Sequence, residues 1–377
     1  MLLIDYSMNK IIKTMVSALF IVPVLVSCKG NGNILSIGKP EFVSEFPRTG
    51  QLKEIESFNL NEIGLRSVKV VDTLLFVDKA GVFGNIGNAW VIYSLDGKKE
   101  YGGCMRTGNG PGEFPYSAPY VSSCYFFNDN DSLFVHAPNR NKGQILELNI
   151  TRHLQDSSQA PHPVIETGYM QSNSWAVNPC GKGKVLITQP NDYLTGFQRL
   201  MYENDTVRQL AVTRDIDKAT ISPGGDVNLI AKVVRYDAAA DMFVEAMLYL
   251  NQINISSADG TEGKTICVGK KLDDVSVVEK TPEAERGRDY ISVSAWEEGF
   301  GAIYFGGTIL EYQQRLVNDT QIQFFDWEGN PKYLVELPYQ ASAFDIDFKN
   351  NVMYVINKAE DTLTAYDATE IVQSMRN

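Results

Sequence analysis

Residues 66–103 read RSVKVVDTLLFVDKAGVFGNIGNAWVIYSLDGKKEYGG and contain four short apolar or alternating runs. The first two runs flank the turn Asp72-Thr73 and the last two flank Asp96-Gly97. Asp-Gly between two alternating runs is among the strongest signals for a β-hairpin. The stretch therefore predicts two successive hairpins, which together make one four-stranded unit. The predicted strands are Arg66–Val71, Leu74–Asp78, Trp90–Leu95 and Lys99–Gly103.

The same pattern of short runs and turn residues continues along the rest of the chain, and no sustained helical period interrupts it. Regularly spaced short strands are typical of sandwiches, barrels and propellers. Here they also fall into a longer repeat of about 53 residues, which favours a propeller with one unit per blade. The further units cover residues 121–167, 175–212, 227–268, 290–337 and 343–366.

The sixth unit lacks a fourth strand, whereas the run Leu52–Phe58 precedes the first unit as a surplus strand. Pairing this run with Leu363–Tyr366 would close a ring, and a closed ring leaves no long exposed strand edge. We therefore expect an all-β fold over residues 51–368, a β-propeller closed by an N-terminal strand that joins the last blade. Six units can be counted, although the period alone allows five to seven blades. Residues 369–377 are expected to be a C-terminal tail.

The first residues have the pattern of a secretory signal. Lys10 and Lys13 precede the apolar run Met15–Val26, which is too short to span a membrane and matches the basic-then-apolar order of a signal peptide. The run ends in Leu25-Val26-Ser27-Cys28, which resembles the lipobox of bacterial lipoproteins. That resemblance implies a signal peptide over 1–27 and a diacylglycerol on Cys28. A plain signal peptide with a chance cysteine is the alternative.

Residues 28–50 suit a flexible tether, because Cys28 is followed by Lys29-Gly30-Asn31-Gly32-Asn33. Two acyl chains give stable membrane anchoring, so we expect the protein to be lipid-anchored at the outer membrane. The run after Cys28 carries no acidic residue, which favours the periplasmic side, with the cell surface as the alternative. The formal charge of −12 makes nucleic acid an improbable partner because phosphate backbones are repelled.

One loop carries a family resemblance. Arg106-Thr107-Gly108-Asn109-Gly110-Pro111-Gly112-Glu113-Phe114 resembles the Gly-x-Gly-Pro-Gly-Glu-Phe signature of the six-bladed, TolB-like propeller lipoproteins. In that family the motif follows the first blade, which is its position here. The resemblance implies the six-bladed fold and a place in the cell envelope, and it implies no particular activity.

The same loop is a candidate binding site. Glycines permit close backbone approach, so Arg106, Asn109, Gly110, Gly112 and Glu113 could form a nest of N–H groups that receives an anion. The alternative is a crossover between blades one and two. In that arrangement Glu113 accepts backbone N–H bonds and Phe114 packs between the blades.

Asp345 and Asp347 alternate in the predicted innermost strand of the sixth unit and therefore share a face. Facing the channel, their oxygens could hold a cation such as Ca²⁺; otherwise we expect no cofactor. The alternative is that they are solvated or cap a turn. Arg286, Arg288, Asp289 and Tyr290 cluster before the fifth unit as a binding loop or an exposed charged linker.

The sequence contains no catalytic set. It has no Gly-x-Ser-x-Gly elbow and no His-Glu-x-x-His, so no residue is assigned a catalytic role.

Four cysteines follow Cys28, and they allow three disulfide pairings or four free thiols. The tryptophans are expected to pack between blades, with sugar stacking as the alternative. These residues are Cys104, Cys124, Cys180 and Cys267, and Trp90, Trp175, Trp296 and Trp327.

These observations favour a lipid-anchored binding or scaffold protein of the cell envelope whose partner is a protein, a peptide or a glycan. The alternative is a metal-dependent propeller hydrolase or lactonase with its site in the central channel, a reading that rests on the fold and on Asp345 and Asp347.

Overall fold

The computed structural model describes residues 36–58, 60, 62–80, 87–170, 174–191, 196–217, 221–222, 224–314 and 319–377. The predicted signal peptide, residues 1–27, and the predicted lipidation site, Cys28, lie outside the described residues. All statements below concern the unit that begins at Ile34.

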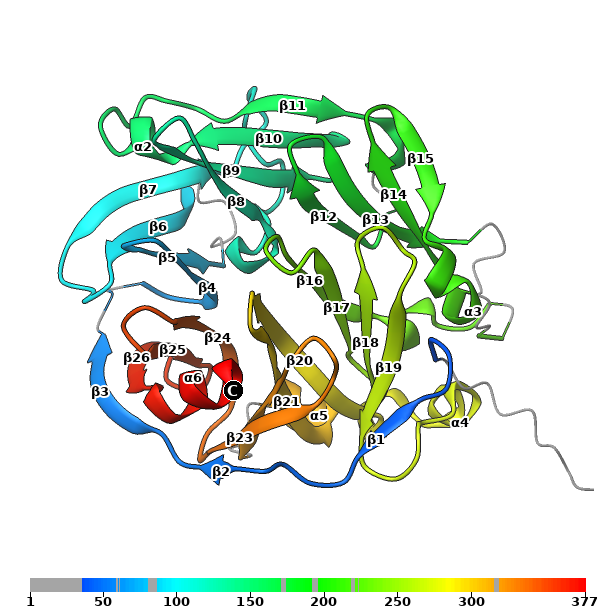
Figure 1. Cartoon of the computed structure of the whole chain (residues 1–377). Helices are drawn as coiled ribbons and strands as arrows, with labels where there is room; N and C mark the ends of the chain where they lie inside the picture. The colour runs from blue at the N-terminus through cyan, green and yellow to red at the C-terminus, as the bar shows by residue number, and fades with distance from the viewer. Residues whose placement is uncertain are drawn as a thin grey trace, which may run out of the picture. The chain divides into compact units, whose positions relative to one another are not determined.

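Six antiparallel sheets surround a common centre (Figure 1). The first three sheets are β4 (Leu65–Val71), β5 (Leu74–Lys79), β6 (Asn88–Ser94) and β7 (Glu100–Arg106); β8 (Tyr125–Asp129), β9 (Ser132–Asn139), β10 (Gln144–Asn149) and β11 (His162–Glu166); and β12 (Ala176–Gly181), β13 (Lys184–Pro190), β14 (Phe197–Glu203) and β15 (Thr206–Gln209). The other three contain β16 (Lys232–Asp237), β17 (Met242–Met247), β18 (Ile253–Ser257) and β19 (Gly263–Val268); β20 (Gly287–Trp296), β21 (Gly299–Thr308), β22 (Thr320–Phe325) and β23 (Pro331–Leu337); and β24 (Ala341–Asp347), β25 (Val352–Asn357) and β26 (Thr362–Asp367).

The first strand of each sheet lies nearest the centre. β24 contacts β4, β20 contacts β24, β16 contacts β20, and β12 contacts both β16 and β8. The 3₁₀ turn η1 (Val121–Ser123), just before β8, contacts β4 and β16. This arrangement is the six-bladed β-propeller that the sequence predicts, with one sheet per blade.

The ring closes as expected. β3 (Lys53–Phe58) pairs antiparallel with β26 as the fourth strand of the last sheet, and Phe58 lies opposite Leu363. The phenyl ring of Phe58 stacks on that of Tyr354 in β25, with 6.2 Å between the ring centroids. The prediction that Leu52–Phe58 joins Leu363–Tyr366 is therefore confirmed.

Two more strands precede β3. β1 (Glu41–Val43) pairs parallel with β19, and β2 (Thr49–Gly50) pairs parallel with β23. The described part of the segment expected as a flexible tether, residues 36–50, thus runs along the outer edges of the fourth and fifth sheets. Backbone groups at a sheet edge pair with almost any sequence, so the polar composition of this segment hides its strands.

The C-terminal tail also has structure. Thr369–Arg376 forms helix α6, whose Ile371, Val372 and Met375 side chains are buried in the core between the fifth and sixth sheets. Two predicted strands begin late, because Val121–Ser123 and Val227–Ile230 are 3₁₀ turns. Within the described ranges, no helix has the length and apolar character needed to cross a membrane.

The two faces of the ring differ. Because successive strands are antiparallel, the turns after the first and third strands of each sheet lie on one face, here called the turn face. The turns after the second strands and the connections between sheets lie on the other, the connection face. Many turns on the turn face are tight and place Asp or Asn at positive φ, as at Asp72, Asn130, Asp131 and Asn204.

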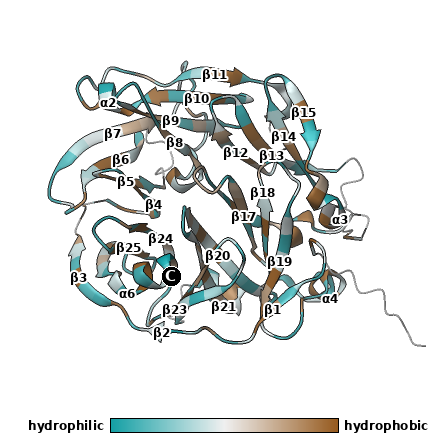
Figure 2. Ribbon diagram, in the orientation of Figure 1, coloured by the Kyte–Doolittle hydropathy of each residue, from teal (hydrophilic) through white to brown (hydrophobic). Residues whose placement is uncertain are grey.

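Apolar side chains fill the space between neighbouring sheets. Between the first and second sheets, Phe76 and Trp90 pack with Val135 and Leu146, all fully buried. Burying a large apolar side chain stabilises the fold by about 1.5–3 kcal/mol. Figure 2 shows the outer strands β3 and β15 mostly in the hydrophilic colour, in agreement with their exposure.

Candidate functional site

A cavity of about 800 Å³ opens where the first strands of the blades converge. All six sheets contribute to its wall, either through the starts of their first strands or through adjoining connections on the connection face. The wall includes Arg66 at the start of β4, the crossover 114–123 before β8, and Arg140 in the turn between β9 and β10. The site therefore depends on the whole ring.

The wall of this cavity is strongly basic, although the chain as a whole has a net charge of −12. Among the described residues, its lining holds six Lys or Arg side chains and no Asp, Glu, His or Cys. We call this cavity the basic pocket. The six cations are Arg66, Arg140, Lys232, Arg235, Arg288 and Lys358.

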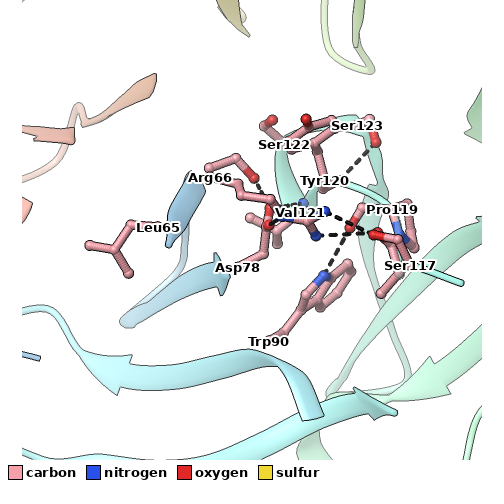
Figure 3. A network of polar contacts seen from close by, with 12 residues as sticks. Leu65, Arg66, Asp78, Trp90, Ser117, Pro119, Tyr120, Val121, Ser122 and Ser123 are labelled. Atoms are coloured by element: carbon pink, nitrogen blue, oxygen red, sulfur yellow. Dashed lines mark hydrogen bonds and ion pairs between the residues drawn. The ribbon is translucent and has the colours of Figure 1, made fainter. Parts of the chain in front are cut away.

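Arg66 is fixed by a buried carboxylate. Asp78 in β5 accepts hydrogen bonds from Arg66 Nε at 2.6 Å and from the Val121 backbone N–H at 3.0 Å, and it also bonds the Ser67 hydroxyl (Figure 3). Arg66 Nη1 donates to Ser117 Oγ at 2.8 Å. The first blade thus holds the crossover that forms one wall of the basic pocket.

The same wall has a second support. Trp90 Nε1 donates to the Pro119 carbonyl at 3.0 Å, and the Arg66 guanidinium lies 4.9 Å from the centre of the Tyr120 ring (Figure 3). Burial raises the pKa of Asp78 despite the nearby Arg66 charge. Asp78 therefore acts as a buried anchor for the wall.

Arg235 in β16 lies at the inner end of the basic pocket. A second cavity of about 130 Å³ shares Arg235, Ser122 and Asn178 with it. Arg235 Nη2 donates to Ser122 Oγ and Nη1 to the Val234 carbonyl, both at 2.7 Å. Burial lowers the pKa of Arg235 to about 10, because the charged guanidinium loses hydration inside the protein. A bound anion would stabilise that charge.

Aromatic rings hold the cations of the fifth and sixth blades. The Arg288 guanidinium lies 5.0 Å from the ring centres of both Tyr249 and Tyr312. Lys358 Nζ lies 3.2 Å from the centre of the Tyr312 ring. Such contacts stabilise a cation without removing its charge.

Lys232 and Arg140 complete the set. Lys232 lies 5.0 Å from the centre of the Phe197 ring and is near Glu245. Burial disfavours ionisation of Glu245, but Arg199 and Lys232 outweigh it and hold its pKa below the usual value. Arg140 Nη1 donates to the Trp175 carbonyl at 2.8 Å, and burial lowers the pKa of Arg140.

Several polar atoms in the wall have no hydrogen-bond partner among the described residues. Buried polar groups are nearly always paired, so orphans gathered in one place indicate a missing acceptor or donor. Four of the five orphans in this wall are nitrogen or hydroxyl groups that can donate. They are Asn178 Nδ2, Arg235 Nε, Arg288 Nε and Ser342 Oγ, with Asn139 Oδ1 as the acceptor.

Exposed aromatic rings border the pocket. Tyr116 and Tyr120 are in the crossover and are 81% and 50% exposed. Trp175, just before β12, also lines the cavity. Of the tryptophans expected between blades, Trp90 and Trp296 are buried there, whereas Trp175 faces the site.

The 106–114 loop, which the sequence singles out, closes on itself. Glu113 accepts a hydrogen bond from the Gly110 N–H at 2.8 Å, and its other carboxylate oxygen lies 3.4 Å from Arg106 Nε. A Cβ on Gly112, whose φ is +74°, would lie 2.1 Å from the Pro161 carbonyl oxygen. Phe114 is buried between the first two blades. This is the geometry of the crossover alternative.

That loop does not share the site. None of Arg106, Asn109, Gly110, Gly112 and Glu113 lines the basic pocket, whereas the next residues, from Phe114 onward, do. The glycine-rich loop comes directly before the crossover 114–123, and it thereby positions the part of the pocket wall that this crossover forms. Arg288, noted in the sequence as part of a charged cluster, is in the pocket.

Asp345 and Asp347 are in β24, an innermost strand as expected, but they have separate partners. Asp345 accepts from Val70 N at 2.7 Å and from Trp296 Nε1 at 2.9 Å. Asp347 accepts from the backbone N–H groups of Lys349 and Asn350 and caps a turn. Within the described part of the chain, no three His, Cys, Asp or Glu side chains form a group that could hold a metal ion.

All four described cysteines are free thiols. Burial raises the pKa of Cys104 and Cys180 to about 12 each, so these thiols stay protonated and unreactive at neutral pH. The sequence allows either free thiols or disulfide pairs, and the structure has the former.

No protein-family model matches the sequence, and no curated protein matches it. Solved structures are similar in fold. A member of the DUF4221 family from Bacteroides vulgatus is 10% identical, covers 84% of this chain and 97% of its own, and has a TM-score of 0.50. A calcium-binding protein, regucalcin, from Agrobacterium tumefaciens is 9% identical over 85% of this chain and 95% of its own, with a TM-score of 0.45. At 10% identity, the likeness to the DUF4221 structure bears on the fold alone. That fold, from the six sheets described above, is a six-bladed β-propeller.

Proposed function

We propose that this protein binds an anionic ligand in the basic pocket and acts as a binding protein of the cell envelope. The observation that carries the proposal is the convergence of six Lys and Arg side chains on one cavity whose described lining has no acidic residue. In a chain with net charge −12, this local reversal of charge focuses anions on the cavity.

The composition of the wall favours binding over catalysis. General acid–base chemistry needs a group that exchanges a proton near neutral pH, most often His, Asp or Glu. The described wall instead offers guanidinium, ammonium, hydroxyl and amide groups, which recognise an anion through charge and hydrogen bonds. The partner is therefore a ligand, or a protein, peptide or glycan that presents an acidic group.

Thermal unfolding with added anions tests this proposal. A ligand that binds only the folded state raises the unfolding temperature as its concentration rises. We expect citrate and other polycarboxylates to raise the Tm of the purified protein. The double variant Arg235→Met, Arg288→Met is expected to lose this response.

The matched control is Arg152→Met, which removes an exposed arginine on the short helix α2 (Ile150–His153), outside the pocket lining. It should respond to anions as the natural protein does. Equal responses in the control and the double variant would show that the anions bind elsewhere and would overturn the proposal.

We further propose that Cys28 carries a lipid that anchors the protein to the outer membrane, with its propeller on the periplasmic side. The lipobox-like end of residues 1–28 and the similarity of the 106–114 loop to TolB-like propeller lipoproteins support this location. Expression with a clickable fatty acid should label the protein, whereas Cys28→Ala should remain unlabelled and leave the membrane fraction. Proteinase added to intact cells should spare the anchored protein, and its digestion would favour the cell surface instead.

A further inference from the structure

We infer that the ligand of the basic pocket is a short acidic saccharide that carries more than one acidic group. This inference rests on the proposed anion-binding function and adds the chemical class of the ligand. Three features of the pocket lead to it: the number and spread of unpaired guanidinium groups, the orphaned donors in the wall, and the exposed aromatic rings at its border.

The first feature is a set of guanidinium groups that have no acidic partner. Arg140, Arg235 and Arg288 belong to the second, fourth and fifth blades, and none forms an ion pair with a carboxylate among the described residues. Each can bind a carboxylate or sulfate in a two-point contact. Because the second and fifth of six blades lie opposite each other in the ring, Arg140 and Arg288 offer separate positions for anions. A ligand with several acidic groups occupies more of them than a single small anion does.

The second feature is the set of buried polar atoms in the wall that have no hydrogen-bond partner among the described residues. Asn178 Nδ2 and Ser342 Oγ are uncharged donors that lie between the cationic groups in the wall. A metal ion or a bare inorganic anion leaves scattered neutral donors unpaired, whereas the hydroxyl groups of a sugar can both accept and donate. The orphan acceptor Asn139 Oδ1 needs a donor, which a sugar hydroxyl supplies and an inorganic polyanion such as sulfate does not.

The border of the pocket supplies the third feature. The Tyr116 ring is 81% exposed beside the cavity, and that of Tyr120 is 50% exposed. An exposed ring in contact with a polar cavity gives a flat apolar surface on which the C–H face of a sugar can lie. The cavity of about 800 Å³ is within the usual range for small-molecule sites and limits the enclosed part of the ligand to a few sugar units.

Isothermal titration calorimetry of the full-length protein in detergent tests the inference. The probes are a panel of oligosaccharides with two or more uronate or sulfate groups, the matching monosaccharides, the neutral maltotriose, and triglutamate as an acidic peptide. We expect at least one acidic oligosaccharide to bind about tenfold more tightly than its monosaccharide, because several groups bind at once. Maltotriose should not bind measurably.

Variants assign the binding to the pocket. Tyr116→Ala should weaken the acidic oligosaccharide about fivefold, the effect of losing one stacking ring, and leave triglutamate unchanged. Tyr169→Ala removes another exposed tyrosine, 49% exposed and outside the pocket lining, and should change neither. Arg235→Met should weaken every anion, and Arg152→Met none.

The outcomes separate the two proposals. If triglutamate binds as tightly as every acidic saccharide and Tyr116→Ala affects neither, the saccharide inference is wrong while anion binding stands. If no anion in the panel binds, or if Arg235→Met changes no affinity, the proposed function fails together with the inference.

Discussion

Glu113 occupies the position that a bound anion would take in the 106–114 loop. Its carboxylate accepts the Gly110 N–H, and its backbone carbonyl accepts from Asn139 and Lys142 of the next blade. A residue bonded in this way stabilises the fold rather than receiving a ligand.

Replacing Glu113 should therefore affect stability and spare anion binding. We expect Glu113→Ala to lower the free energy of unfolding by about 1 kcal/mol, because it leaves the partly buried Gly110 N–H without its acceptor. Glu113→Gln keeps an acceptor oxygen and should lower the free energy of unfolding by less. Urea denaturation of the natural protein and both variants measures these differences. A stable Glu113→Ala protein that no longer binds anions would contradict this assignment.

Asp289 gives a prediction about pH. Burial, and then the nearby Asp273 charge, raise the pKa of Asp289 to about 7 in the folded protein, whereas an unfolded Asp titrates near about 4. Between these values the folded state binds more protons than the unfolded state. The contribution of this group to stability is thus full below about pH 4 and is lost as pH rises to about 7.

The comparison of the natural protein with Asp289→Asn isolates this contribution. The natural protein should lose more stability between about pH 4 and 7 than the variant does, because Asn cannot release a proton. Urea denaturation across this pH range provides the measurement. Parallel pH profiles would show that Asp289 has an ordinary pKa.

At the scale of elements, strand β3 closes the ring. Phe58 at its end is only 7% exposed and packs on Tyr354, whereas Ile55 in the same strand is 56% exposed. Phe58→Ala should lower the free energy of unfolding by about 3–4 kcal/mol. Ile55→Ala should change it by less than about 0.5 kcal/mol. Equal effects of the two substitutions would show that β3 does not hold the last blade.

The strands could be predicted because their signal is local. Alternating side chains and Asp-Gly or Asn-Asp turns specify each hairpin, as at Asp96-Gly97. β1 and β2 could not be predicted, since they are short and pair through backbone groups at sheet edges. Helix α6 is too short for a clear period, and its buried Ile371 and Met375 gain their environment only from the assembled blades.

The candidate site was only partly predictable. Arg66, Lys232 and Arg288 are each the first or second residue of an innermost strand, in the first, fourth and fifth blades. A superposition of the repeated units brings these positions together, whereas the spacing of the runs alone does not single them out. Arg140 and Lys358 lie in turns between second and third strands, and only the ring geometry shows that these turns face the same cavity.

At the scale of the whole propeller, charge is distributed unevenly. Acidic residues fill the tight turns of one face, for example Asp72, Asp131 and Asp205, while cations gather in the pocket on the other. Like charges around one cavity repel each other, so the empty pocket carries an electrostatic cost that a bound anion removes. Under the proposed function, these acidic turns would disfavour anions at that face, whereas the basic pocket would bind them.

The position of a bound anion in a crystal tests anion binding by the basic pocket most directly. Crystals soaked in selenate or tungstate would reveal the anion by its anomalous scattering. We predict a strong peak inside the basic pocket, within hydrogen-bonding distance of Arg235 or Arg288. Anomalous peaks confined to the outer surface, with none in the basic pocket after a long soak, would contradict anion binding by this pocket.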